Sequence, residues 1–478
     1  CHTGHAMLPA SDPKSSMNKH NIAATCGRSG CHVKQKIDYN ASVHFKSLKS
    51  GKDDSPGCAD CHGNHQIENT DRFQNEGLKS QFIAKLCADC HASVQLAEKY
   101  SFSQINADSY YKSYHGLAVR GGSKSAANCA SCHNYHDIRP SSDPLSSINR
   151  ANLSKTCGKC HPNAKIDGEF AKVHVTNTEE ESILLWIVKT SYILIIIGTI
   201  GIMFIHNVLD LFRKLQEKKK HKHAIKKMKE EGKYYIRMTK NERIQHFFLL
   251  TSFIGLVISG FALVYPDAMW VRGIRYVLGE YAFEIRGLSH RILGIIMICV
   301  SFYHIWYLFF HAKGKELLRD FLPAWHDWDD VKVNFKYLTF RSEEKPAFRR
   351  FSYMEKAEYW ALVWGTVVMS LTGLLLMFND FFLANAPKIW FDISTLIHYY
   401  EAWLATLAII VWHFYYVIFS PEVYPLNTAF ITGKMSEELM EAEHPLELAR
   451  LKELEKEEGE TKNEKPEDDE DNIVKEEN

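Results

Sequence analysis

Cysteine and histidine residues gather in the first third of this 478-residue chain, in a spacing typical of covalent haem attachment. In a Cys-x-x-Cys-His motif the two thiols add to haem vinyl groups and the adjacent imidazole becomes an iron ligand. Four complete copies occur, together with a wider copy that ends in Cys31-His32 and a stub, Cys1-His2. Zinc has no use for a histidine fused to every second cysteine, so the repetition favours haem over zinc. The attachment cysteines are Cys1, Cys26, Cys31, Cys58, Cys61, Cys87, Cys90, Cys129, Cys132, Cys157 and Cys160.

The cysteine usage also indicates a compartment. The remaining cysteine, Cys299, lies in an apolar stretch, so no pairs are left for a disulfide framework. Haem c is attached outside the cytoplasm, which predicts a periplasmic location for residues 1–178. The chain lacks an initiator Met and a signal peptide, so we expect its true start to lie elsewhere. We interpret Cys1-His2 as a truncated haem motif, in preference to a lipidated N-terminal cysteine.

An internal repeat organises this region. Ser42-Val43-His44 recurs 71 residues later as Ser113-Tyr114-His115. The segment from Ser16 to Gly27 aligns in the same way with the segment from Ser147 to Gly158. We therefore expect three tandem units, each with two haem motifs, and a loop-rich fold with short helices around the haems.

Histidine counting predicts how the irons are ligated. The motif histidines are His2, His32, His62, His91, His133 and His161. An equal number of other histidines matches them by position in the repeat: His5, His44, His65, His115, His136 and His174. This equality predicts about six bis-histidine c haems. Such an iron has no open coordination position and carries electrons. The sequence does not indicate which distal histidine serves which haem.

The rest of the chain predicts a membrane domain. Five apolar stretches are long enough to cross a bilayer, at 183–211, 244–265, 288–311, 357–378 and 395–419. The predicted fold is an all-α membrane helical bundle of five transmembrane helices, preceded by a loop-rich multihaem cytochrome c domain. The expected divisions are a c domain at 1–178, an anchor helix at 179–212, a basic linker at 213–242, a four-helix di-haem domain at 243–430 and an acidic tail at 431–478. Its composition predicts disorder for this tail, with a short helix over 436–458 as an alternative.

Charge sets the expected orientation. Residues 213–229 hold nine Lys or Arg and one acid, directly after the first span. By the positive-inside rule this segment is cytoplasmic, which puts the cysteine-rich region on the periplasmic side of a bacterial inner membrane. The charge of this segment and the extracytoplasmic attachment of haem c therefore predict the same orientation. We expect a lipid bilayer as an environment and no nucleic acid as a partner.

Histidines inside apolar spans are costly and suggest function. His398 and His413 lie fifteen residues apart in the last span, or about 22 Å along a helix. His290 starts the third span near the depth of His398, and His246 starts the second span near the depth of His413. This arrangement predicts two b haems stacked across the bilayer. His304 also lies at the depth of His413.

Residues 240–425 resemble the di-haem cytochrome b subunits of formate dehydrogenases and nickel-iron hydrogenases. The matching residues are Glu242-Arg243-x-x-His246, His290-Arg291-x-x-Gly294, Lys356-x-x-Tyr359-Trp360 and His398 with His413. The resemblance implies that His246 pairs with His413 and that His290 pairs with His398. His304 stays an alternative to His246, and a third b haem between His206 and His304 is a further alternative.

The resemblance also implies a quinone site. Its position is held here by Ser352-Tyr353-Met354-Glu355-Lys356, which keeps the family's lysine and loses its asparagine and glycine. Lys356 and Tyr353 are the expected menaquinone-binding residues, at the cytoplasmic haem. Glu355 and Tyr359 are further candidates for handling protons.

As a whole, the chain resembles the quinone-linked Cbc-type cytochromes of metal-reducing anaerobes. This implies a quinol:cytochrome c-type electron path in anaerobic respiration, from the membrane quinone pool to periplasmic cytochromes or other redox proteins. The direction of flow stays open. One alternative is an anchor subunit of a dehydrogenase or hydrogenase complex. The other is a terminal reductase acting at a c haem. The protein can act as a homo-oligomer or within a larger respiratory complex.

Overall fold

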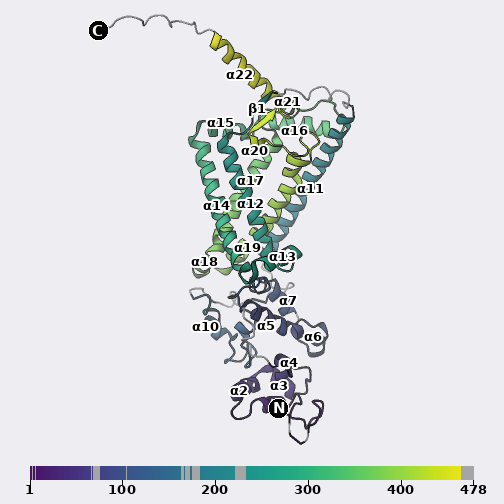
Figure 1. Ribbon diagram of the computed structural model, residues 1–478, viewed down its shortest axis with the longest axis vertical. Coiled ribbons are helices and arrows are strands. Elements are labelled where there is room, and N and C mark those ends of the chain that lie inside the picture. Colours follow the sequence, from purple (N-terminus) through teal and green to yellow (C-terminus); the bar gives the residue numbers. More distant parts are fainter. Residues whose placement is uncertain are drawn as a thin grey trace, which may run out of the picture. The chain divides into compact units, whose positions relative to one another are not determined.

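The structure is a computed structural model that describes the chain except residues 3, 6, 66, 68–75, 104, 163–165, 167–172, 175–182, 221–232 and 464–478. The chain divides into two compact units. Unit 1 comprises Cys1–Val188, Ile254–Leu293 and Thr372–Leu396. Unit 2 comprises Lys189–Phe253, Gly294–Leu371 and Ile397–Asn478. Figure 1 labels their helices and strands.

Five helices are long and apolar enough to span a bilayer, which confirms an integral membrane protein. They are built from α11 (Ile183–Lys220), α12 (Lys240–Val264), α14 (Ala282–Phe310), α17 (Tyr353–Met377) and α19 (Lys388–Ala408). Two π-helical segments, Ile409–His413 and Tyr415–Phe419, continue α19.

The expected connections between the spans contain short helices. These are α13 (Met269–Leu278), a 3-10 turn at Gly279–Tyr281, α15 (Ala312–Phe321), α16 (Trp325–Leu338) and α18 (Asn379–Asn385). The basic linker expected at 213–242 is also partly regular, because α11 runs to Lys220 and α12 begins at Lys240. Residues 221–232 of this linker lie outside the described residues.

The cysteine-rich region of unit 1 consists of short helices joined by loops. They are α1 (Ile22–Cys26), α2 (Val33–Ala41), α3 (Val43–Lys49), α4 (Cys58–His62), α5 (Glu76–His91), α6 (Val94–Tyr100), α7 (Ile105–Lys112), α8 (Tyr114–Gly121), α9 (Cys129–His133), a 3-10 turn at Arg150–Asn152 and α10 (Leu153–Cys157). One small apolar cluster joins Ala84, Tyr110 and Val119. Such sparse apolar packing leaves most of this region's stability to other contacts.

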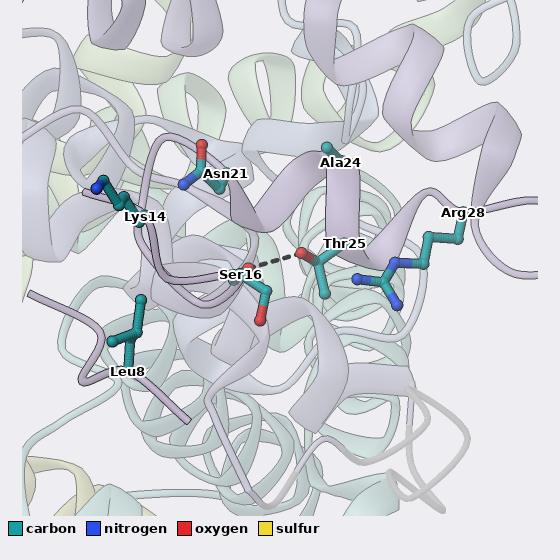
Figure 2. A pocket seen from close by; sticks show the side chains of 7 residues that line it. All are labelled: Leu8, Lys14, Ser16, Asn21, Ala24, Thr25 and Arg28. Atoms are coloured by element: carbon teal, nitrogen blue, oxygen red, sulfur yellow. Dashed lines mark hydrogen bonds between the residues drawn. The ribbon is translucent and has the colours of Figure 1, made fainter. Parts of the chain in front are cut away.

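The loops before α1 and α10 fold in the same way. The side chain of Asn21 donates to carbonyl groups 8 and 6 residues before it, and Asn152 does the same. Thr25 donates to the carbonyl of Ser16 at 2.6 Å, a bond drawn in Figure 2, and Thr156 makes its counterpart at 2.7 Å. The two segments aligned in the sequence therefore share one pattern of hydrogen bonds. A shallow hollow of about 430 Å³ lies beside the first of these loops (Figure 2).

Residues 434–463 of the acidic C-terminal segment form a strand and two helices, which agrees with the short helix expected over 436–458 as the alternative to disorder. After α20 (Ala429–Thr432), strand β2 (Lys434–Ser436) pairs antiparallel with β1 (Tyr234–Ile236). Helices α21 (Glu437–Glu443) and α22 (Pro445–Asn463) follow. A buried cluster of Tyr235, Met435, Met440 and Leu448 holds these elements together. Residues 464–478, the rest of the predicted tail, lie outside the described residues.

Candidate haem-binding sites

Two Cys-x-x-Cys-His motifs form complete short helices, α4 and α9. In one helical turn the two cysteines, three residues apart, face the same side, and the histidine follows directly. Helix α9 begins at a capping box, in which Asn128 exchanges two bonds with Ser131. At the start of α4, the backbone N–H of Gly57 donates to Asp60 at 2.7 Å. The motif residues thus build the local structure that presents their own thiols. No disulfide joins any of these cysteines.

Five pairs of imidazole rings face each other, and each pair joins one motif histidine to one distal histidine. A metal–imidazole bond of about 2 Å, plus roughly 1 Å from nitrogen to ring centre, puts two axial ligands about 6 Å apart. The observed distances between ring centres fit this value, so the donor set suits a six-coordinate haem iron. They are 6.2 Å for His2 and His65, 6.2 Å for His44 and His91, 6.1 Å for His62 and His136, 6.3 Å for His115 and His161, and 6.2 Å for His133 and His174.

Four of the five pairs, all except His133 with His174, follow a rule that the sequence did not reveal. The distal histidine of a Cys-His-x-x-His segment meets the motif histidine of the neighbouring repeat, as in His2 with His65. The distal histidine of a Ser-x-His segment meets a motif histidine later in its own repeat, as in His44 with His91. Within the described part of the chain, His5 and His32 join no such pair. The six c haems remain predictions.

Serine caps position two of the distal histidines. Ser42 accepts a bond from the backbone N–H of Phe45 at 3.2 Å and starts α3, and Ser113 starts α8 in the same way. His44 and His115 therefore sit at the second helical position. Burial, and then the neighbouring charge of His91, lowers the pKa of His44 to about 4. Burial also lowers the pKa of His115. Both rings are neutral at pH 7, the form in which imidazole binds a metal.

The last motif of unit 1 meets a carboxylate from outside the cysteine-rich region. Nδ1 of His161 lies 3.2 Å from Asp380 of α18. Nearby, Nε of Arg120 donates to Asp267 at 3.0 Å, and Lys124 donates to Glu280 at 3.1 Å. These contacts bring the His115–His161 pair against the segments that connect the spanning helices in this unit. Carboxylates commonly orient metal-binding imidazoles in this way.

In unit 2, His246 and His413 lie close enough for a charge on one to act on the other. Nδ1 of His413 is 2.6 Å from Glu358, which leaves Nε2 for a metal. Nδ1 of His246 is buried and has no hydrogen-bond partner among the described residues, and its ring lies 5.6 Å from that of Phe430. A buried polar atom without a hydrogen-bond partner costs free energy, so it calls for an explanation such as a bound group. These two rings suit a b haem.

The alternative ligands His304 and His206 are occupied by other bonds. Nδ1 of His304 is 2.7 Å from Gln245 and Nε2 is 3.0 Å from the hydroxyl of Tyr359. The ring nitrogens of His206 lie 3.2 Å from Tyr353 and 3.3 Å from a second tyrosine hydroxyl. With both nitrogens in hydrogen bonds, neither ring offers a free donor to iron. The structure favours His246 over His304 as the partner of His413.

In unit 1, His290 lies beside a serine and a glycine of α12. Its Nδ1 is 2.8 Å from the hydroxyl of Ser259, and a Cβ on Gly260 would lie 3.4 Å from its ring. A Cβ at this distance would make an ordinary van der Waals contact with the ring. His398 belongs to unit 2, so its predicted pairing with His290 stays a prediction.

The residues expected at the quinone site make other contacts. The buried ammonium of Lys356 lies 2.8 and 2.9 Å from the two oxygens of Asp327. The hydroxyl of Tyr353 accepts from Asn334 at 2.8 Å. Glu355 accepts from the N–H of Ser352 at 2.8 Å and caps α17, so it serves helix structure. The Ser-x-x-Glu spacing is a capping box and was readable in the sequence.

Apolar spanning helices that carry closely placed imidazoles define an integral membrane protein suited to holding haem. Residues 237–433 match the family described as prokaryotic cytochrome b561. This match supports a membrane b-type cytochrome in electron transfer for this part of the chain and implies b haems. No curated protein matches the chain. The cysteine-rich region lies outside the matched residues.

Proposed function

We propose that this protein carries electrons between a membrane quinone pool and redox partners of its cysteine-rich domain, through two b haems and about six c haems. The observation that carries the proposal is the set of five imidazole pairs with ring centres 6.1–6.3 Å apart. Each pair joins a histidine of an attachment motif to a second imidazole. Ligation on both faces leaves an iron no position for substrate, which favours electron transfer over substrate chemistry at these sites.

The chain's own residues hold and orient the cofactors. Haem supplies one-electron exchange when bound. The motif cysteines would anchor it covalently, and the paired histidines would bind its iron. Asp380 and Glu358 fix the rings of His161 and His413 through their Nδ1 atoms. The proposed path therefore has an end at the His246–His413 site and a link at the His115–His161 site.

The proposed location is a bacterial inner membrane, with the cysteine-rich domain in the periplasm. Basic residues between the first two spans and the extracytoplasmic chemistry of haem c attachment support this orientation. A terminal reductase would need an iron with an open position, which the five pairs do not offer.

Reduction by quinol tests the proposal. We expect menaquinol, added to the purified protein in vesicles, to reduce b haem before c haem in stopped-flow absorbance. His413→Ala should remove this reduction, because His246 alone leaves its iron under-ligated. A protein whose c haems are reduced by menaquinol without any b haem would contradict the proposed path. Co-purification of a stoichiometric catalytic subunit would make the protein an anchor subunit instead.

A further inference from the structure

A cavity of about 240 Å³ lies among α12, α13 and α14 in unit 1. Its walls are mainly apolar, with Ile258 and Ala262 from α12, Val271 and Ile274 from α13, and Leu293 from α14. An apolar cavity of about 150 Å³ holds one benzene, so this one is large enough for a fused two-ring head group. Apolar pockets with a few convergent polar groups are the usual form of small-molecule sites.

The cavity opens towards the lipid side of the spanning helices. Two of its lining residues, Ile258 and Ile285, are 47% and 41% exposed. One wall is α13, whose opposite face exposes Trp270 and Tyr276. A short amphipathic helix with exposed aromatic rings is typical of the membrane interface. A ligand can therefore enter from the bilayer without crossing water.

Polar groups converge on the inner end of this cavity. Arg286 donates from Nη1 to the carbonyl of Ser259 at 3.3 Å, while its Nε is buried without a hydrogen-bond partner among the described residues. A charged guanidinium that lines a mainly apolar cavity favours an acceptor beside it. Arg275, also in the lining, is committed to the carbonyls of Arg120 and Pro266.

The cavity is one side chain away from a predicted haem ligand. Ser259 lines it, and the hydroxyl of Ser259 is 2.8 Å from Nδ1 of His290. His290 itself does not line the cavity. Ser259 therefore contacts both the cavity and a predicted haem ligand.

We propose that this cavity binds the ring of a membrane quinone, with the Arg286 guanidinium directed at one of the ring's oxygens. The proposal rests on the proposed function for the quinone pool and differs from the site expected around Lys356. A lipid acyl chain would fill the apolar walls but leave Nε of Arg286 unsatisfied. A quinone carbonyl satisfies it, which is why the chemistry favours a quinone over a lipid tail.

Photolabelling of the purified, haem-loaded protein tests this site directly. The probe is a naphthoquinone with a photoreactive azide and a short isoprenoid tail, and labelled peptides are mapped by mass spectrometry. We expect labelling within residues 254–293, suppressed by excess menaquinone and unaffected by excess phospholipid. Ala262→Phe fills the cavity and should reduce the labelling roughly tenfold or more, since the ring and the new side chain cannot share the space.

Two further variants complete the test. Leu288→Phe adds an aromatic ring to α14 at an exposed position outside the cavity lining and should leave the labelling unchanged. Arg286→Gln keeps the cavity but removes the charged donor, and should weaken probe binding roughly tenfold. Haem spectra show whether each variant is folded. If Ala262→Phe fails to fold, Arg286→Gln carries the test alone.

The outcomes of the labelling experiment distinguish a failure of the cavity proposal from a failure of the proposed function. Labelling confined to the region of Ser352 and Tyr359 would overturn the cavity proposal and leave the proposed function standing. Suppression by phospholipid as strong as by menaquinone would make the cavity a lipid site and would also overturn it. No labelling anywhere, together with no reduction of the haems by quinol, would overturn both.

Discussion

At the residue scale, carboxylates contact two of the candidate haem-binding histidines. Asp380 contacts Nδ1 of His161 in unit 1, and Glu358 contacts Nδ1 of His413 in unit 2. A carboxylate at Nδ1 fixes the ring and makes the other nitrogen a stronger donor, which stabilises the oxidised metal. We therefore expect these two carboxylates to set redox potentials as well as geometry.

Asp380→Asn tests this role. Loss of the negative charge should raise the midpoint potential of the haem between His115 and His161, by roughly 60 mV for each tenfold change in relative affinity for the two oxidation states. Spectroelectrochemical titration measures the shift. Asp267→Asn is the matched control, since Asp267 binds Arg120 and no histidine. An equal shift in both variants would assign the effect to the surrounding charge.

The b-haem ligands can be separated by single substitutions. His246→Ala should remove the haem shared with His413, because one axial nitrogen is lost. His304→Ala should leave both b haems in place, since both nitrogens of His304 are in hydrogen bonds to Gln245 and Tyr359. The b-type absorbance of purified membranes checks this. The reverse result would make His304 the ligand.

The cysteines and histidines of the attachment motifs could be predicted from the sequence more readily than the distal histidines that pair with them. A Cys-x-x-Cys-His motif is local, so its thiols and proximal histidine are visible in five consecutive letters. The predicted distal ligands depend on which repeat approaches which, and the ring contact of His2 with His65 joins histidines of different repeats. Glu355 was assigned a possible proton role although its spacing from Ser352 already indicated a capping box.

At the scale of elements, the last spanning helix departs from a regular α-helix near His413. Two π-helical segments follow Ala408 and rotate the residues after them relative to an ideal helix. The sequence argument assumed ideal α-geometry between His398 and His413. π-Turns are frequent at functional sites, and no simple sequence signal marks them. The five spans themselves were predictable because length and hydropathy suffice for a membrane helix.

The C-terminal helices show where composition misleads. An excess of acids predicted disorder, yet Met440 and Leu448 pack on Tyr235 and Met435. A few apolar residues at helical spacing are enough to dock a short element onto an existing surface. These contacts support the short helix that was expected over 436–458 as the alternative to disorder.

The docked α21 should respond to pH through Glu443. Burial raises the pKa of this carboxyl to about 7, against the opposing charge of Lys214 and with the help of Glu422. The folded state therefore holds a proton that the unfolded state releases above pH 4.5, so stability falls as pH rises from about 4.5 through about 7. The loss is at most about 3 kcal/mol.

Hydrogen exchange over α21 and α22, corrected for intrinsic pH dependence, measures this change. Glu443→Gln should flatten the dependence, because the amide does not titrate. Glu441→Gln, at an exposed position of the same helix, should keep it. Identical pH profiles in the wild type and Glu443→Gln would show that another group is responsible.

On the scale of the whole molecule, the chain combines a repeated cysteine and histidine region with a membrane part that matches prokaryotic cytochrome b561. The contacts of Arg120, Lys124 and His161 join the repeat region to α18 and to the connections between spans within unit 1. The c haem between His115 and His161 is therefore the one expected to exchange electrons with the membrane haems.

The ratio of covalent c haem to extractable b haem tests the account most directly. We predict about three c haems for each b haem in the pyridine haemochrome spectrum of the purified protein, with the c haem retained on the chain after acid–acetone extraction. A ratio near two would indicate a third b haem or missing c haems. Complete extraction of haem, with zinc or nothing bound to the cysteines, would contradict the central claim.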